Sequence, residues 1–222
     1  MKNLALTTAF MGLLAFGASA QNFATGIRAG VNLTTFQNED LEDNKYAVGI
    51  NVAVPLEFIL HQNFSIQPEI QFIQKGVAFE ATDNITGLDL KTRFFTNYLE
   101  IPILAKGKFG SQALSGYLIA GPTLGFSTNR YAVAILDDER ETETIDFNDE
   151  GDQTDNRFDI GAAFGLGLEA GIGSNSALVL DARYNLDFND NTSFENDPPS
   201  DWTKTFNSGI AITIGYLYKF GK

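Results

Sequence analysis

A long alternation of apolar and polar positions constrains the fold of this chain more than any other feature. Between Phe158 and Ile172 every second residue is apolar, and the residues between them are glycines, carboxylates and one alanine. Successive side chains of a β-strand point to opposite faces, so a period of two predicts a strand. An apolar face of this length predicts that one side of the strand lies in an apolar medium.

The same alternation returns along the rest of the chain and predicts eight strands. They cover approximately residues 23–35, 48–58, 64–72, 98–106, 114–127, 158–172, 178–188 and 210–220. The segment 114–127 is apolar on both sides, so its inward face is not assigned. Four prolines lie inside these strands, and because proline cannot donate to a strand ladder we expect bulges or local loss of pairing there; they are Pro55, Pro68, Pro102 and Pro122. We also expect a bulge at Gly76, because the apolar parity shifts between Phe72 and Val77.

The connections between the predicted strands alternate in length. Short turns fall at residues 60–63, 110–113 and 173–176, and long polar loops fall at 37–45, 80–91, 129–156 and 189–205. This asymmetry, with all short turns and both termini at one end, is typical of outer-membrane barrels. The apolar faces carry no charge, and Arg or Lys at the midplane of such a barrel costs about 2–4 kcal/mol. The sequence therefore predicts an all-β, eight-stranded antiparallel up-and-down transmembrane β-barrel.

Aromatic residues cluster near the short turns. We interpret them as a girdle at the periplasmic rim, with ordinary cross-strand packing as the alternative; they are Phe58, Phe64, Tyr216, Tyr218 and Phe220.

The two ends of the chain predict export. Residues 1–20 combine Lys2, an apolar stretch and Ala18-Ser19-Ala20, which is the layout of a secretory signal peptide. The predicted domains are this signal peptide (1–20) and an outer-membrane barrel (21–222) with periplasmic termini and no helical anchor. The last strand resembles the C-terminal β-signal of Gram-negative outer-membrane barrels, which implies the barrel assembly machinery as a partner; the residues concerned are Thr213, Gly215, Tyr218 and Phe220.

The charge and composition exclude several classes of protein. Removing residues 1–20 removes one base and no acid, so the net charge changes from −13 to −14. Nucleic-acid binding is excluded because phosphate contacts require clustered Lys and Arg. The chain contains no cysteine, which excludes disulfides and thiolate metal sites. We expect a monomer without cofactors.

An eight-stranded barrel has a lumen just wide enough for side chains. Buried charges persist when they are paired, so we expect a structural polar network inside the barrel, with glycines making room for the long side chains. Its predicted members are Arg28, Glu57, Glu69, Glu100, Lys106, Asp159, Glu169, Asp181 and Arg183. A conducting pore or proton path is the alternative.

Catalysis and metal binding have little support in the sequence. The single histidine, His61, lies in a short turn, so no Ser-His or His-metal site can be assembled near the outer rim. Residues 137–155 hold ten carboxylates against one base, Arg140. Within them Asp146, Asn148 and Glu150 have the spacing of a calcium loop, but its twelfth position is Arg157. A solvated acidic loop and a divalent-cation site that bridges to lipopolysaccharide both remain open.

Three segments carry a resemblance to a known family. Residues 26–36, 98–106 and 120–125 resemble strand motifs of the "porin family" outer-membrane β-barrel domain, which includes PorT-like proteins and has OmpA/OmpX-like architecture. The resemblance implies the fold and says little about activity. We expect a non-enzymatic outer-membrane protein whose acidic extracellular loops have a structural or surface-interaction role. A narrow channel or a transport or secretion accessory is one alternative, and a soluble secreted β-barrel is another.

Overall fold

The computed structural model describes residues 23–38, 44–82, 89–136, 139–148 and 151–221. The predicted signal peptide lies outside these ranges. The described residues contain no helix long and apolar enough to cross a membrane. The strands, in chain order, are β1 (Phe23–Gln37), β2 (Lys45–His61), β3 (Phe64–Thr82), β4 (Asp89–Gly110), β5 (Leu114–Leu136), β6 (Glu139–Ile145), β7 (Gln153–Asp155), β8 (Phe158–Ile172), β9 (Ser176–Asp187), β10 (Thr192–Phe194) and β11 (Phe206–Phe220).

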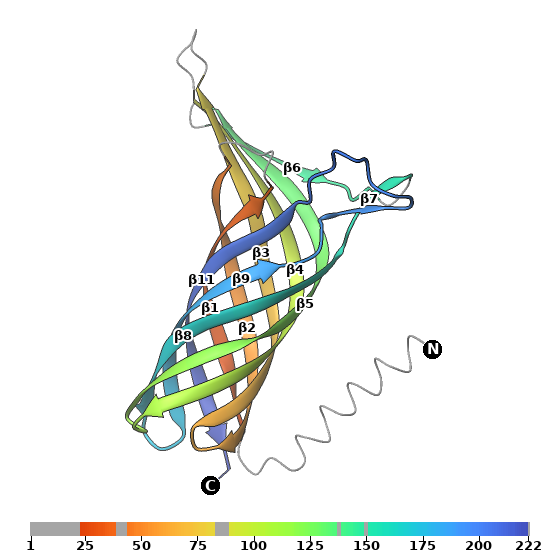
Figure 1. Cartoon of the computed structure of the whole chain (residues 1–222). Helices are drawn as coiled ribbons and strands as arrows, with labels where there is room; N and C mark the ends of the chain where they lie inside the picture. Colours follow the sequence, from red (N-terminus) through yellow and green to blue (C-terminus); the bar gives the residue numbers. More distant parts are fainter. Residues whose placement is uncertain (1–22, 39–43, 83–88, 137–138, 149–150, 222) are drawn as a thin grey trace.

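Eight of these strands close into one antiparallel ring, which forms the wall of a tilted barrel (Figure 1). Consecutive strands pair from β1 to β5, after which β5 pairs with β8, β8 with β9, and β9 with β11. β11 returns to β1, and the two strands pair along their whole length from Phe23 opposite Phe220 to Gln37 opposite Phe206. A sheet in lipid has to satisfy all of its backbone groups, and closure achieves this. The predicted eight-stranded barrel is confirmed.

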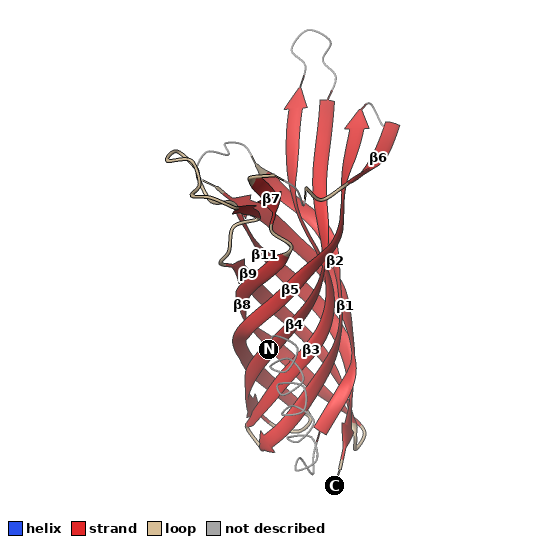
Figure 2. Ribbon diagram, turned by 90° about the vertical axis from the view of Figure 1, so that its right-hand side faces the viewer, coloured by secondary structure: helices blue, strands red, loops and turns tan. Residues whose placement is uncertain are grey.

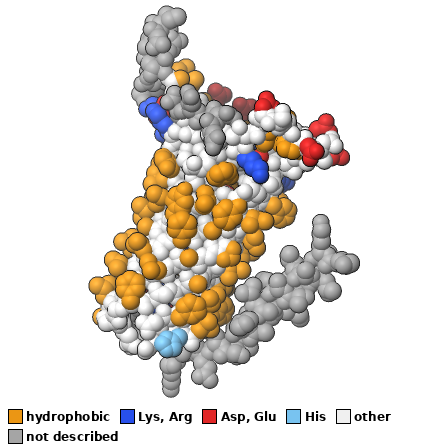
Figure 3. Space-filling view, in the orientation of Figure 1, with side chains coloured by type: hydrophobic (Ala, Val, Ile, Leu, Met, Phe, Trp, Pro, Cys, Tyr) orange, Lys and Arg blue, Asp and Glu red, His pale blue; other side chains and the backbone are white. Residues whose placement is uncertain are grey.

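The outer surface of the wall is apolar. On β8 and β9 the outward residues are uncharged, and Leu166 and Leu180 keep 60% and 50% of their surface exposed. Figure 3 shows hydrophobic side chains over the wall, with the Lys, Arg, Asp and Glu side chains of this view gathered at one end. Exposed leucines in unbroken rows require a hydrocarbon solvent. The alternative of a soluble secreted barrel does not fit this surface.

The three short connections lie at one end of the barrel, which we call the short-turn end, and the longer ones lie at the opposite long-loop end (Figure 1). Gly110 and Gly173 begin two of the short turns with φ values of 117° and 65°, which favour glycine. The predicted girdle aromatics lie at the short-turn end, where the rings of Phe23 and Phe220 stack with centroids 4.6 Å apart. Phe64 and Tyr218 there keep 42% and 40% of their surface exposed.

The prediction of long polar loops is partly wrong. β3, β4 and β5 continue past the end of β2, and β6 adds a fourth strand, so that a sheet projects beyond the wall (Figure 2). A further pair, β7 with β10, forms a small separate sheet. The residues of β6 are polar because water contacts both faces of this strand, and its backbone hydrogen bonds to β5 still form.

The four strand prolines interrupt the pairing without changing its register. Each lies where the ladder to the preceding strand lacks two residue pairs, in β1–β2, β2–β3, β3–β4 and β4–β5. The ladders β5–β8, β8–β9, β9–β11 and β11–β1 are continuous. Proline lacks the N–H that would donate across the ladder. The predicted local loss of pairing is confirmed on this side of the wall, and it occurs without bulges at the prolines.

The bulge predicted at Gly76 is confirmed as a register shift in the neighbouring β2–β3 ladder. β3 keeps one register with β4 through Gly76, but the β2–β3 register shifts between Tyr46 opposite Val77 and Asn51 opposite Ile73. The step on β2 is one residue longer than the step on β3, so the face of β3 that matches the inner face of β2 changes there. Beyond the shift, Ala78 on β3 is buried in one cluster with Ala47 on β2.

Candidate functional site: the charged barrel interior

The barrel interior contains all nine residues of the predicted polar network, and every one of them is buried. They join three ion-paired clusters stacked along the lumen, which we call the lower, middle and upper clusters, starting from the short-turn end. Bases outnumber acids in the lower cluster, and acids outnumber bases in the upper cluster.

The lower cluster lies just inside the short turns. The Lys106 ammonium is 3.0 Å from Glu57 Oε2 and 3.3 Å from Glu169 Oε2. Lys108 contacts the same two carboxylates at 2.5 and 3.0 Å, and Lys219 lies 2.7 Å from Glu169 Oε1. Three bases therefore hold two acids. Lys108 and Lys219 were not among the predicted members.

The middle cluster is a closed ring of two arginines and two acids. Arg28 contacts Glu69 Oε2 at 2.5 Å and Asp181 Oδ1 at 3.1 Å. Arg183 binds the same pair, at 2.9 Å from Glu69 Oε2 and 2.8 Å from Asp181 Oδ2. Tyr117 donates its hydroxyl to Asp181 at 3.1 Å. The charges balance, and guanidinium donors occupy both oxygens of each carboxylate.

The upper cluster is built around Lys75, a residue absent from the predicted network. Its ammonium lies 2.6 Å from Glu100 Oε1, 2.6 Å from Asp159 Oδ2 and 2.8 Å from Asp187 Oδ2. The signal that could have found it is the continued alternation of β3 beyond Phe72, where the predicted strand ended; the inward series is Gln67, Glu69, Gln71, Ile73 and Lys75. The three carboxylates are close enough together to hold a metal ion, but Lys75 supplies the positive charge among them.

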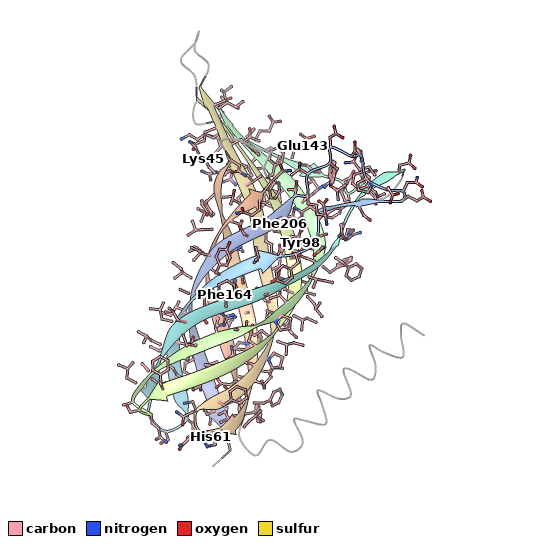
Figure 4. All side chains as sticks on the ribbon, in the orientation of Figure 1. Lys45, His61, Tyr98, Glu143, Phe164 and Phe206 are labelled. Atoms are coloured by element: carbon pink, nitrogen blue, oxygen red, sulfur yellow. The ribbon has the colours of Figure 1, made fainter. Side chains whose placement is uncertain are left out.

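An apolar layer lies beyond the upper cluster. Ala47, Ala78, Phe95 and Val133 pack together, with Tyr131 and Ile135 against them. At the other end of the lumen, a cavity of about 410 Å³ opens between the short turns and reaches Lys108, Glu169 and Lys219. His61 lies exposed at its rim (Figure 4), as the last residue of β2 beside the short turn and not within the turn as predicted. The three ion-paired clusters thus lie between this mouth and the apolar layer.

Glycines make the space that the long inward side chains occupy. A Cβ at Gly215 would lie 2.6 Å from Arg28 Cγ, and one at Gly167 would lie 2.3 Å from Tyr117 Cζ. Both distances are too short for real contacts, so these glycines are required by packing. Gly215 belongs to the predicted assembly signal, and so does Thr213, whose hydroxyl donates to Asp181 at 2.8 Å. Tyr218 and Phe220 of the same pattern point outward.

The predicted calcium-loop residues are not assembled into a metal site by the described contacts. The Asp146 carbonyl accepts from Arg130 at 2.6 Å, and the Asn148 side chain donates to the Gln153 carbonyl at 2.8 Å. The Asn148 backbone N–H donates to Asp155 at 2.5 Å. Glu150 lies outside the described residues. These contacts tie the segment to itself and to Arg130.

The closed ring, the apolar outer wall and the ion-paired interior define an eight-stranded transmembrane β-barrel. The family comparison agrees: the model for "Outer membrane protein beta-barrel domain" matches residues 19–193. The chain belongs to this family, which places it in the outer membrane. The match is to the general domain, so the narrower PorT-like resemblance remains a prediction.

The comparison with solved structures finds small outer-membrane barrels. Neisserial surface protein A shares 15% identity at a TM-score of 0.47, covering 90% of this chain and 97% of that one. A major outer membrane protein from Thermus thermophilus shares 14% identity at a TM-score of 0.46, covering 90% and 99%. Ail of Yersinia pestis, in complex with the heparin analogue sucrose octasulfate, shares 16% identity at a TM-score of 0.39, covering 89% and 99%. The search of curated proteins found no match.

Proposed function

We propose that this chain is a closed, non-enzymatic outer-membrane barrel whose role is structural or surface-interacting. The observation that carries the proposal is the ion-paired interior. Each of the three clusters uses charged side chains to bind other charged side chains, and the middle cluster is balanced between two bases and two acids. Displacing such side chains would leave unpaired charge in a low-dielectric interior, which is strongly unfavourable. A solute path through the lumen would require that displacement.

The orientation follows from the unequal ends of the barrel. The short-turn end faces the periplasm, together with the start of β1 at Phe23 and the end of β11 at Phe220, which pair with each other. The projecting sheet β3–β6 faces the outside. The barrel assembly machinery would recognise the last strand, where Tyr218 and Phe220 are exposed on the outer surface.

The absence of catalysis rests on the position of the titratable groups. The single histidine of the sequence, His61, lies at the short-turn end, remote from the exposed surface of the projecting sheet. The buried carboxylates are held by lysine and arginine, which leaves them poorly placed to act as general acids or bases on an external substrate.

The acidic residues of the long-loop end give the protein its proposed contacts. Anionic side chains beside the headgroups of lipopolysaccharide would be bridged by divalent cations, since carboxylate oxygens suit Ca²⁺ and Mg²⁺. An isothermal titration with calcium that yields heat above the buffer blank would support this contact, and a titration without such heat would remove it.

Reconstitution in planar lipid bilayers tests the closed barrel. We expect no conductance steps above those of protein-free bilayers, with a large water-filled porin as the positive control. Regular steps from the purified protein would establish a narrow channel instead and overturn the proposal.

A further inference from the structure

The projecting sheet ends in a strand whose second edge is open. β5 pairs with β8 over Leu114–Phe126 and then changes partner, pairing with β6 over Arg130–Leu136. β6 is the last strand of the sheet, and no other described strand pairs with it. Figure 2 shows it at the margin of the projection, beyond the wall. An open strand edge presents unpaired backbone donors and acceptors, which is the surface that β-augmentation uses.

The side chains of β6 are sorted by charge between its two faces. Residues that lie opposite each other in a ladder share a face. Thr142 lies opposite the buried Val133, so Thr142 and its alternates Arg140 and Thr144 follow the inner face. The residues opposite Ala132, Ala134 and Leu136 follow the outer face, and all three are glutamates: Glu143, Glu141 and Glu139.

This outer face carries a regular row of negative charge. Side chains at alternate strand positions lie roughly 6.6 Å apart. Residues 139–144 are all exposed, so the row is open to solvent (Figure 4 labels Glu143). Within the described part of the chain these three glutamates form no salt bridge with a base, whereas Glu80 on β3 is paired with Lys45 at 2.6 Å.

The charge pattern decides between two occupants of the edge. A second copy of the chain could pair its own β6 antiparallel with this edge, so that the outer faces of the two strands lie on the same side of the sheet. That pairing would place Glu141 opposite Glu141 and Glu139 opposite Glu143. Like charges directly opposite each other destabilise a strand pair. A strand with Lys or Arg at alternate positions would instead place a cation opposite each glutamate.

We propose that the free edge of β6 is a docking site for an extended basic segment of a partner protein. The partner adds a fifth strand to the projecting sheet, and its alternate Lys or Arg side chains pair with Glu139, Glu141 and Glu143. Backbone hydrogen bonds supply the pairing, and the charge row selects the sequence and the register. The inference rests on the proposed function, because the sheet has to face the outside of the cell.

The test uses the purified full chain in detergent and a fluorescent peptide of sequence Thr-Lys-Val-Lys-Thr-Lys-Val. Fluorescence anisotropy measures binding, and hydrogen exchange measures the protection of backbone amides in β6. We expect binding together with increased protection across Glu139–Ile145. The same peptide with every backbone nitrogen methylated keeps its charges but cannot add a strand, so it should not bind.

Two triple variants complete the test. Glu139→Gln/Glu141→Gln/Glu143→Gln should weaken peptide binding about tenfold, because three exposed ion pairs are lost. The matched control Asp152→Asn/Glu195→Gln/Asp201→Asn removes three exposed acids elsewhere at the same end and should bind as the unmodified chain does. Equal binding of the methylated peptide, equal loss in the control variant, or no binding of the unmethylated peptide would each overturn the docking site. None of these results would open the barrel, so the bilayer measurement judges the closed interior separately.

Discussion

Lys75 and Asp187 are 112 residues apart in the chain, yet the Lys75 ammonium lies 2.8 Å from both carboxylate oxygens of Asp187 inside the barrel. The contact joins β3 to β9 across the lumen, between strands that do not pair with each other. Side chains rather than backbone ladders therefore connect opposite walls. The upper cluster fixes the barrel across its diameter in this way.

Removing the Lys75 charge should destabilise the barrel strongly. Lys75→Met leaves three buried carboxylates without their shared cation, and breaking a buried pair costs about 3–5 kcal/mol. Urea unfolding in lipid vesicles measures the change. Lys91→Met is the control, because the Lys91 side chain is half-exposed and its ammonium lies as far as 4.0 Å from Glu80; the change should shift the free energy of unfolding by less than about 0.5 kcal/mol. Equal stability of the two variants would contradict the upper cluster.

Gly215 should be intolerant of a single added carbon. In Gly215→Ala the new Cβ meets Arg28 Cγ at 2.6 Å, whereas nothing lies within 4 Å of a Cβ at Gly107. Refolding into vesicles, without any cellular machinery, should show Gly215→Ala less stable by about 1–3 kcal/mol, as expected of overpacking. Gly107→Ala should behave as the unmodified chain. If Gly215→Ala refolded with unchanged stability, its role would lie in recognition and not in packing.

Phe220 should matter more in the cell than in the test tube. It points outward at the end of the last strand, as Phe188 does at the other end of the wall. We expect Phe220→Ala and Phe188→Ala to refold in vitro with similar yields, while Phe220→Ala alone accumulates poorly in the outer membrane. Heat-modifiable gel migration of the membrane fraction measures this accumulation. Equal accumulation of both variants would remove the predicted assembly signal.

A charge placed on the outer wall should report the lipid directly. Leu166 lies midway along β8 with 60% of its surface exposed. Leu166→Arg should lose about 2–4 kcal/mol of unfolding free energy in vesicles. Glu195→Arg, at an exposed position outside the wall, should lose almost nothing. A negligible cost at Leu166 would mean that water and not hydrocarbon covers this face.

The projecting sheet should carry a carboxylate that titrates at low pH. Lys45 donates a hydrogen bond to Glu80 and attracts its charge, and both effects lower the pKa of Glu80 below its ordinary value. The stabilisation is therefore present above the ordinary pKa and is lost as the pH falls through the lowered one. Carbon-detected NMR titration should find this lowered pKa, and Lys45→Met should raise it. An unchanged pKa in the variant would contradict the pairing.

The proline positions divide the wall into two halves of different local stability. The ladders that join consecutive strands from β1 to β5 are interrupted. Backbone amides beside these gaps should exchange their hydrogens with solvent faster than amides in the continuous β8–β9 ladder. Pro122→Val restores an N–H that can donate to β4. The free energy of local opening, measured by hydrogen exchange, should therefore rise by about 0.5–1.5 kcal/mol. Pro198→Val, outside the strands, should leave the pattern unchanged. Uniform exchange around the ring would contradict the interruption.

Much of the fold was predictable because a barrel in lipid sorts its residues by a period of two. Every outward residue of β8 from Phe158 to Ile172 is apolar, so the acids between them had to face inward. The interior was predictable for the same reason, since Arg28, Glu69, Asp181 and Arg183 alternate with the outward apolar residues of their strands.

The rest could not be predicted because the alternation of apolar and polar residues identifies a strand only where one face meets an apolar medium and the other face a polar one. Near the long-loop end the buried apolar residues Ile73 and Val77 lie on either side of Lys75 in the sequence, and they hid it. Beyond the wall both faces meet water, so the polar segment around Glu141 lacked the alternation of a half-buried strand. The pairing of each cation with a particular acid depends on how strands that face each other across the lumen are positioned along the barrel axis. The local sequence pattern of a strand does not encode that position.

The accessibility of one inward residue tests the closed interior most directly. The chain has no cysteine, so a single replacement gives one thiol. Thr123→Cys places it inside the barrel on β5, where the native side chain is 6% exposed, and Ser193→Cys places it on exposed β10. In nanodiscs, a small water-soluble thiosulfonate should modify the thiol at position 193 rapidly and leave the one at position 123 unmodified. Modification of both thiols at similar rates would show a water-filled lumen and contradict the closed barrel.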